Sequence, residues 1–135
     1  MAGEASSVGA GLALDAMTGR ATVTARTTYL ALLSAAPGDS TTLATMTEIT
    51  TAGYARQTVT WSAPSGDPRV TSNTGAVTFG PFTADPPNVT HCALVSAASG
   101  TTGDFIYYWT LDVARDGISG DSITFATGAL VAQLD

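Results

Sequence analysis

Three side chains in one stretch of the chain have the chemistry of a hydrolytic site: His91 and Cys92, the single histidine and single cysteine, and the nearby Asp85. A nucleophile–base pair needs a Ser, Thr or Cys beside the imidazole and a carboxylate behind it. Neighbouring strand residues point to opposite faces, so His91 and Cys92 are not expected to hydrogen-bond each other. We expect an ordinary strand histidine and a small buried cysteine. A hydrolase would require His91 to line a pocket with a nucleophile within about 3 Å.

The acidic residues offer a second candidate, residues 116–121 (Asp-Gly-Ile-Ser-Gly-Asp), which resemble a calcium-binding loop. The segment lacks the carboxylates at alternating positions and the terminal Glu of an EF-hand, so we expect a solvated hairpin turn. The chain also has no phosphate loop, dinucleotide fingerprint or paired-cysteine motif. The sequence therefore predicts no catalytic, cofactor-binding or metal-binding residues, no cofactor, and a protein that is not an enzyme.

Aromatic residues concentrate in residues 104–109 (Asp-Phe-Ile-Tyr-Tyr-Trp). On a regular strand Phe105, Tyr107 and Trp109 share one face, and the residues between them share the other. Such a strand can be central to the core, form a subunit interface or stack on a sugar ring, and we favour the core. Sugar binding would require Trp61 or Trp109 to be exposed in a groove.

The elements that position these side chains begin with a short helix. Leu12 and Ala16, like Ala13 and Met17, are spaced to form apolar faces on a helix. Ser6 or Ser7 is expected to cap its start and Gly19 to end it. Residues 1–11 are mostly Gly, Ala and Ser, which predicts a flexible arm unless a partner orders it. We predict that residues 1–26 form an N-terminal arm and short helix that serve as an anchor.

The rest of the chain, residues 27–135, has the alternation of polar and apolar residues that is typical of strands. The predicted strands cover residues 28–33, 56–61, 69–71, 76–79, 89–97, 105–112, 122–125 and 130–134. Residues 40–53 are expected to be a loop, with room for one helical turn at 43–46. This spacing predicts an all-β domain, a sandwich or jelly-roll-like barrel of about seven or eight strands.

Composition excludes several kinds of partner. The chain has 135 residues, which suits one domain, and only 12% are charged. The net charge is −6, lysine is absent, and the five arginines are scattered rather than clustered. Because phosphate groups are bound by clustered basic residues, we expect no nucleic acid and no anionic membrane surface as partners. No apolar run is long enough for a transmembrane helix.

The order of several segments is more specific than any one of them. Gly-Tyr-Ala-Arg-Gln at 53–57 precedes a strand, Ser-Asn-Thr follows at 72–74, and Val-Thr-His, Ile-Tyr-Tyr-Trp and Phe-Ala-Thr-Gly-Ala-Leu begin at 89, 106 and 125. From about residue 27 to 135, this order resembles small phage structural proteins of the tail-fibre-like or head-decoration family. Tyr54 and Arg56 are its signature positions. The residues themselves place Arg56 at the start of a strand, where it should pair with a carbonyl or an acid near the loop.

The resemblance implies a virion component without catalytic residues, assembled in the host cytoplasm. We expect a capsid (head) decoration protein first, because a small chain without a coiled-coil shaft suits an addition to a surface. The alternative is a minor tail or tail-fibre component, which can include a module that binds host-surface glycans. The implied partners are the major capsid protein or tail proteins, together with further copies of the chain in a homo-oligomer such as a trimer.

Overall fold

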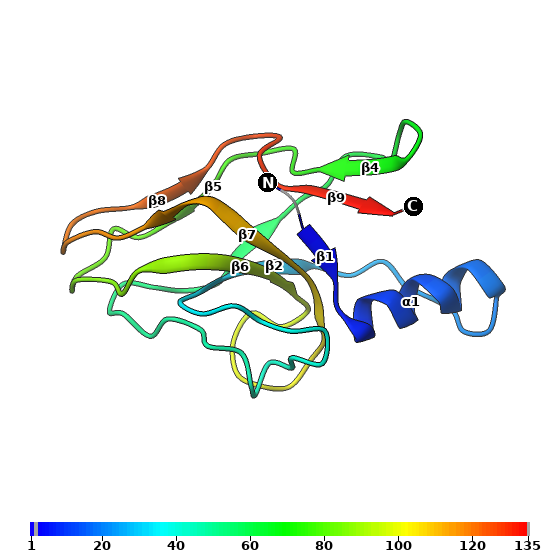
Figure 1. The fold of residues 1–135 in the computed structure, drawn as a ribbon, viewed down its shortest axis with the longest axis horizontal. Helices are drawn as coiled ribbons and strands as arrows, with labels where there is room; N and C mark the ends of the chain where they lie inside the picture. The colour runs from blue at the N-terminus through cyan, green and yellow to red at the C-terminus, as the bar shows by residue number, and fades with distance from the viewer. Residues whose placement is uncertain (2, 135) are drawn as a thin grey trace.

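The computed structural model describes Met1 and residues 3–134 and shows an open β-sandwich with one helix (Figure 1). The helix is α1 (Ser7–Thr18). The strands are β1 (Gly3–Ala5), β2 (Thr28–Leu33), β3 (Gln57–Val59), β4 (Arg69–Ser72), β5 (Val77–Phe79), β6 (Val89–Val95), β7 (Phe105–Arg115), β8 (Ile123–Phe125) and β9 (Val131–Leu134). The predicted all-β class with a short N-terminal helix is confirmed, and the architecture is the sandwich rather than a closed barrel.

One antiparallel sheet in the order β1-β7-β6-β2-β3 forms the larger layer. Two ribbons, β4–β9 and β5–β8, lie over one face of this sheet. The strand β2 is buried on both faces, as its continuous apolar run predicts. Leu30 and Leu32 point into the main core between the layers, whereas Leu33 points into a second cluster on the opposite face.

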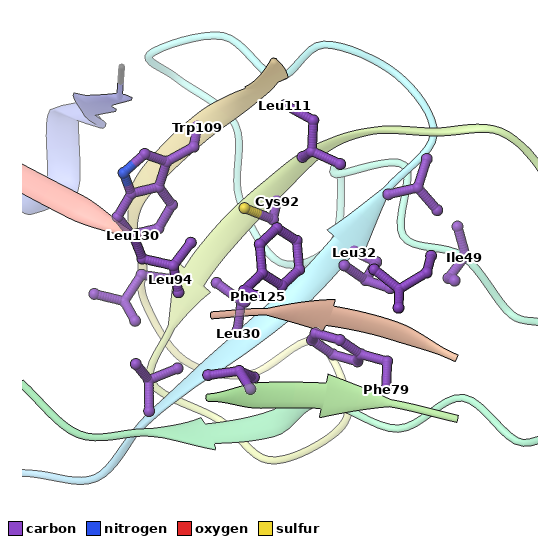
Figure 2. Packing of buried hydrophobic residues seen from close by; sticks show 14 of the residues in the cluster. Leu30, Leu32, Ile49, Phe79, Cys92, Leu94, Trp109, Leu111, Phe125 and Leu130 are labelled. Atoms are coloured by element: carbon purple, nitrogen blue, oxygen red, sulfur yellow. The ribbon is translucent and has the colours of Figure 1, made fainter. Parts of the chain in front are cut away.

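The main core fills the space between the sheet and the ribbons (Figure 2). Phe79 and Phe125 come from the β5–β8 ribbon, and their rings meet edge to face with centroids 6.2 Å apart. Trp109 and Cys92 come from the sheet, and both side chains are fully buried. The second cluster lies under the long loop between β2 and β3, from which Leu43 packs onto the sheet. Both sheet faces are therefore covered, which explains the apolar character of the central strands.

A β-bulge corrects the predicted faces of the aromatic strand. Leu94 pairs with Tyr107, but Val95 pairs with Phe105, so Ile106 is an extra residue on β7. An extra residue reverses the alternation on one side of the bulge. Phe105 therefore packs in the second cluster with Val95, on the face opposite Tyr107. The prediction that Phe105 shares a face with Tyr107 and Trp109 is wrong for Phe105.

The N-terminal segment is more ordered than its composition predicts. Residues 3–5 form the edge strand β1, which pairs with residues 107–109 of β7. Ser6 caps α1, as predicted, through a 3.0 Å hydrogen bond from the Gly9 amide, and Gly19 ends the helix in the left-handed conformation with φ 66°. The Ser6 hydroxyl also donates to the carbonyl of Phe105. Residues 3–11, part of the arm expected to be flexible unless a partner orders it, thus form β1 and the start of α1 at the sheet edge. Within the described residues, no helix has the length and apolarity to span a membrane.

Candidate functional site

His91 is half-buried and lines a surface hollow of about 530 Å³. Glu4, Tyr108 and Asp112 line the same hollow. The Thr90 hydroxyl lies 2.8 Å from His91 Nδ1, so a hydroxyl and an imidazole are within hydrogen-bond distance. Burial lowers the pKa of His91 below its ordinary value, which favours the neutral ring at pH 7.

The remaining part of a hydrolytic triad is not assembled among the described residues. No carboxylate bonds to the His91 ring there. Glu4 and Asp39 instead share the single proton of the Tyr108 hydroxyl, whose oxygen lies 2.8 and 3.0 Å from their carboxylate oxygens. Asp85 accepts the amide of Ser119 at 2.8 Å. The hollow thus has a mixed polar and apolar lining. Glu4 and Asp39 hold β1 and the loop after β2 to Tyr108.

Cys92 points away from the hollow and into the main core, as strand alternation predicts. Burial raises the pKa of the Cys92 thiol, so the thiol stays protonated and unreactive. The acidic segment at 116–121 is a turn but not the expected hairpin, because the strands that it connects, β7 and β8, belong to different sheets. In it a carboxylate oxygen of Asp121 accepts the Ile118 amide at 3.0 Å. In the part of the chain that the structure describes, no group of three or more His, Cys, Asp or Glu side chains could hold a metal ion.

The tryptophans serve the core. Trp109 is fully buried and donates from Nε1 to the carbonyl of Val131 at 2.7 Å. Trp61 is half-buried, stacks on Trp109 with ring centroids 6.0 Å apart and donates to Thr28 Oγ1. Trp109 is not exposed in a groove, and the indole of Trp61 is largely used by this stack. The aromatic strand therefore supports the core interpretation over sugar stacking.

The signature residues Tyr54 and Arg56 meet at one carboxylate, Glu48. Tyr54 donates to Glu48 Oε1 at 2.6 Å and accepts the Leu32 amide at 3.1 Å. Arg56 binds both oxygens of Glu48 and also donates to the carbonyls of Ala97 and Gly100. The expectation that Arg56 pairs with an acid or a carbonyl near the loop is confirmed, because it does both.

Electrostatics reinforce this junction. The hydrogen bond to Glu48 raises the pKa of Arg56, and burial together with the same carboxylate raises the pKa of Tyr54. Both side chains therefore stay protonated. Sequence reasoning did not identify Glu48, because no spacing rule links an acid in a loop to a distant arginine.

Asn73 from the Ser-Asn-Thr segment is a second buried junction. Its side-chain amide donates to the carbonyls of Gly75 and Ala126, at 2.8 and 3.0 Å, and its oxygen accepts the amide of Leu130 at 2.9 Å. Asn73 is 1% exposed, yet its amide group is satisfied by three backbone partners. It joins the turn after β4 to the turn between β8 and β9, so its role is to position backbone.

Apolar side chains that remain accessible gather at the N-terminal end. A groove of about 400 Å³ lies between α1, the start of β7 and the β4–β9 ribbon, and its lining is almost wholly apolar. Ala13, Val70, Ile106 and Ala132 are among the lining residues, and Arg69 stands with them. Next to it, Val8, Leu14 and Met17 of α1 are exposed. The sequence analysis did not predict this apolar surface. The signal that could have indicated it is the helix sequence, which contains a single charged residue.

Comparison with known proteins identifies a family for the chain. No curated protein matches the chain. A family model described as "Podophage GP4 fiber I protein gp80" matches residues 4–133, which include every strand from β2 to β8. The match spans both layers of the sandwich as well as α1. The chain therefore belongs to the podophage GP4 fiber I protein gp80 family, a family of tail-fibre-like phage structural proteins.

Proposed function

We propose that this protein is a non-enzymatic structural component of a phage tail fibre. The observation that carries the proposal is the family match over residues 4–133, since it covers the sandwich and the N-terminal helix together. The family is described as a fibre protein. This description favours the tail or tail-fibre component, which was the alternative in the sequence analysis, over the capsid decoration protein. We therefore rank the tail position first and the head position second.

The use of polar side chains supports a structural role. Arg56, Asn73 and Tyr108 each direct their polar atoms to other groups of the same chain. Groups that are satisfied in this way stabilise loops and are not available to a substrate. The low content of charged residues leaves a surface of Thr, Ser, Gly and apolar side chains, which loses little hydration when it packs against a neighbour.

The attachment is proposed to lie in the N-terminal part of the chain, residues 1–26, of which β1 also completes the edge of the sheet. Residues 27–135 supply the rest of the sandwich domain. Figure 1 shows α1 extending beyond the sheet on the side where β1 and β9 lie. Gly9 is the buried residue of this helix, and residues 18–27 after it are exposed. A helix that projects in this way, followed by an exposed connection, offers a contact to other virion proteins.

The test is to locate the protein in purified particles. Tails and heads are separated after particle disruption, and each fraction is analysed by quantitative mass spectrometry and by immunogold labelling. We expect the protein in the tail fraction and label on fibres. Label confined to heads would overturn the tail assignment and restore decoration. Absence from both fractions would contradict a virion component altogether.

A further inference from the structure

The N-terminal segment of residues 3–18, which we call the strap, lies against the sandwich without building its core. The buried residues of the two core clusters come from residues 30–130. From the strap, Ala5 packs against the main cluster as a partly buried side chain. The buried residue of α1 is Gly9, which has no side chain. The strap therefore covers the core at one edge but does not supply buried apolar side chains to it.

The attachments of the strap are confined to a short part of β7 and one loop residue. β1 pairs with residues 107–109 of β7. The Ser6 amide donates to the Ile106 carbonyl at 3.0 Å, and the Ser7 amide donates to the Asp39 carbonyl at 2.9 Å. Adjoining residues of the strap make these bonds, so we expect the bonds to form and break together.

Tyr108 links the strap to the loop after β2. Its hydroxyl oxygen lies 2.8 Å from a carboxylate oxygen of Glu4 and 3.0 Å from one of Asp39. A tyrosine has one hydroxyl proton, so it serves one of the two carboxylates at a time. The closed strap thus holds two like charges near a single proton, and their repulsion opposes closure. Tyr108 is therefore the side chain whose loss should open the strap most readily.

The far end of the strap leads into an exposed connection. Residues 18–27 are exposed, and residues 22–27 have no regular secondary structure. Arg26 forms an ion pair with Asp104, but the two side chains are 36% and 38% exposed, so the pair contributes little stability. Figure 1 shows α1 projecting beyond the sheet, with this connection returning from its far end. The helix can therefore move away without displacing β2.

The strap covers aromatic rings of β7 through Gly3. A Cβ on Gly3 would lie 2.4 Å from Cε1 of Tyr107 and 2.5 Å from Cδ1 of Trp109. The backbone of β1 thus lies directly on the edges of both rings. Trp109 is fully buried in the closed arrangement. Movement of β1 away from β7 would give water access to it.

We propose that the strap opens as one unit while the sandwich stays folded, and that opening uncovers Trp109 and the edge of β7 at residues 107–109. An uncovered strand edge presents unpaired amides and carbonyls, so the closed strap also keeps this edge from pairing with other chains. Only the use of this motion rests on the proposed function: an open strap frees the N-terminal attachment for other virion proteins. The opening itself is tested on the isolated chain, so its failure leaves the tail position untouched.

The test is native-state hydrogen exchange of the purified full chain. The Ser6 and Ser7 amides should share one opening constant to within about threefold, at least about 100-fold larger than that of the central amides of β2 and β6. Ile123→Val removes a methyl group from the main core and should raise the opening constant of those central amides about fivefold. It should leave Ser6 and Ser7 unchanged. If the strap amides respond as strongly as the core, the strap opens only by global unfolding and the inference is overturned.

A pair of neighbouring tyrosines tests the link to the loop. Tyr108→Phe removes the hydroxyl that the strap contacts and should raise the opening constant of the Ser6 amide about tenfold. Tyr107→Phe is the matched control, because its hydroxyl accepts the amide of Gln133 on β9 at 3.3 Å. It should leave the constant within about threefold. Equal responses of the two variants would contradict closure through Tyr108.

Acrylamide quenching of tryptophan fluorescence tests what opening uncovers. Gly3→Val has no room for its side chain against β7, so it should hold the strap open and increase the quenching. Circular dichroism verifies that its sheet is retained. Gly75→Ala is the control, since a Cβ there meets nothing within 4 Å, and its quenching should match wild type. A folded Gly3 variant with wild-type quenching and wild-type exchange at Ser6 would overturn the inference.

Discussion

Arg56 and Glu48 form a bidentate ion pair, with Nε 2.8 Å from Oε1 and Nη2 2.7 Å from Oε2. The side chain of Arg56 is 4% exposed and that of Glu48 is 20% exposed, so the pair is largely but not fully shielded from water. The other guanidinium donors hold the carbonyls of Ala97 and Gly100. One side chain therefore joins the loop before β3 to the loop between β6 and β7.

Replacing Arg56 with alanine is expected to destabilise the fold. The change leaves Glu48 without its cation and frees two carbonyls, and breaking a buried pair in this way costs about 3 kcal/mol. Urea unfolding followed by tryptophan fluorescence measures the loss. Arg20→Ala is the control, since it breaks the exposed pair with Asp15 and should cost less than about 1 kcal/mol. Equal losses in the two variants would show that the Arg56 junction does not stabilise the fold.

We expect the destabilisation caused by Tyr54→Phe to depend on pH. At neutral pH the variant loses the hydrogen bonds to Glu48 and Leu32, at a cost of about 1–2 kcal/mol. Burial raises the pKa of Tyr54 in the folded state, so above the unfolded pKa the unfolded chain binds fewer protons. Wild type therefore loses about 1.4 kcal/mol per pH unit above about pH 10 from this group alone. The variant has no hydroxyl to titrate at this position and does not lose this stability. The difference in unfolding free energy between wild type and the variant should therefore narrow between about pH 10 and pH 12. A constant gap would contradict the prediction.

Asn73→Asp changes one atom of a buried junction. The new carboxylate oxygen faces the carbonyls of Gly75 and Ala126 where the amide donated, which repels them and costs about 3 kcal/mol at pH 7. Burial and the two carbonyls raise the folded-state pKa of the new acid, so its protonated form is favoured. The deficit should therefore shrink as pH falls towards about 4 and the acid regains a donor. The control is Asn88→Asp at an exposed site, where no such recovery is expected.

The alternating pattern was enough to predict an all-β domain, either a sandwich or a barrel, together with most strand positions, because burial on one face imposes a period of two. The helix caps were predictable because a helix start requires a capping oxygen. Cys92 and Trp109 were placed in the core for the same reason. Arg56 was expected to bind an acid or a carbonyl, but its partner Glu48 comes from a loop whose path depends on tertiary packing. Local patterns carry no information about such pairings.

Two features of β7 were beyond a pattern argument. The bulge at Ile106 has no residue signature, and it moves Phe105 to the other face of the sheet. The edge strand β1 consists of Gly, Glu and Ala, which have low strand propensity. It forms because Ser6 and Glu4 bind β7 at Phe105 and Tyr108, contacts that connect opposite ends of the sequence.

The two glycines of α1 should respond in opposite ways to alanine. A Cβ on Gly9 would lie 2.0 Å from the carbonyl oxygen of Ile106, whereas a Cβ on Gly11 would meet nothing within 4 Å. Alanine in an open helix position adds about 1 kcal/mol, so Gly11→Ala should raise the stability of the helix. Gly9→Ala must instead push α1 off β7 and stretch the hydrogen bonds of Ser6. Hydrogen exchange at the amides of Ser6 and Gly9 measures the detachment directly. Exchange should accelerate in the Gly9 variant and slow or stay unchanged in the Gly11 variant. Shifts in the same direction would mean that α1 is not held to β7 by this close contact.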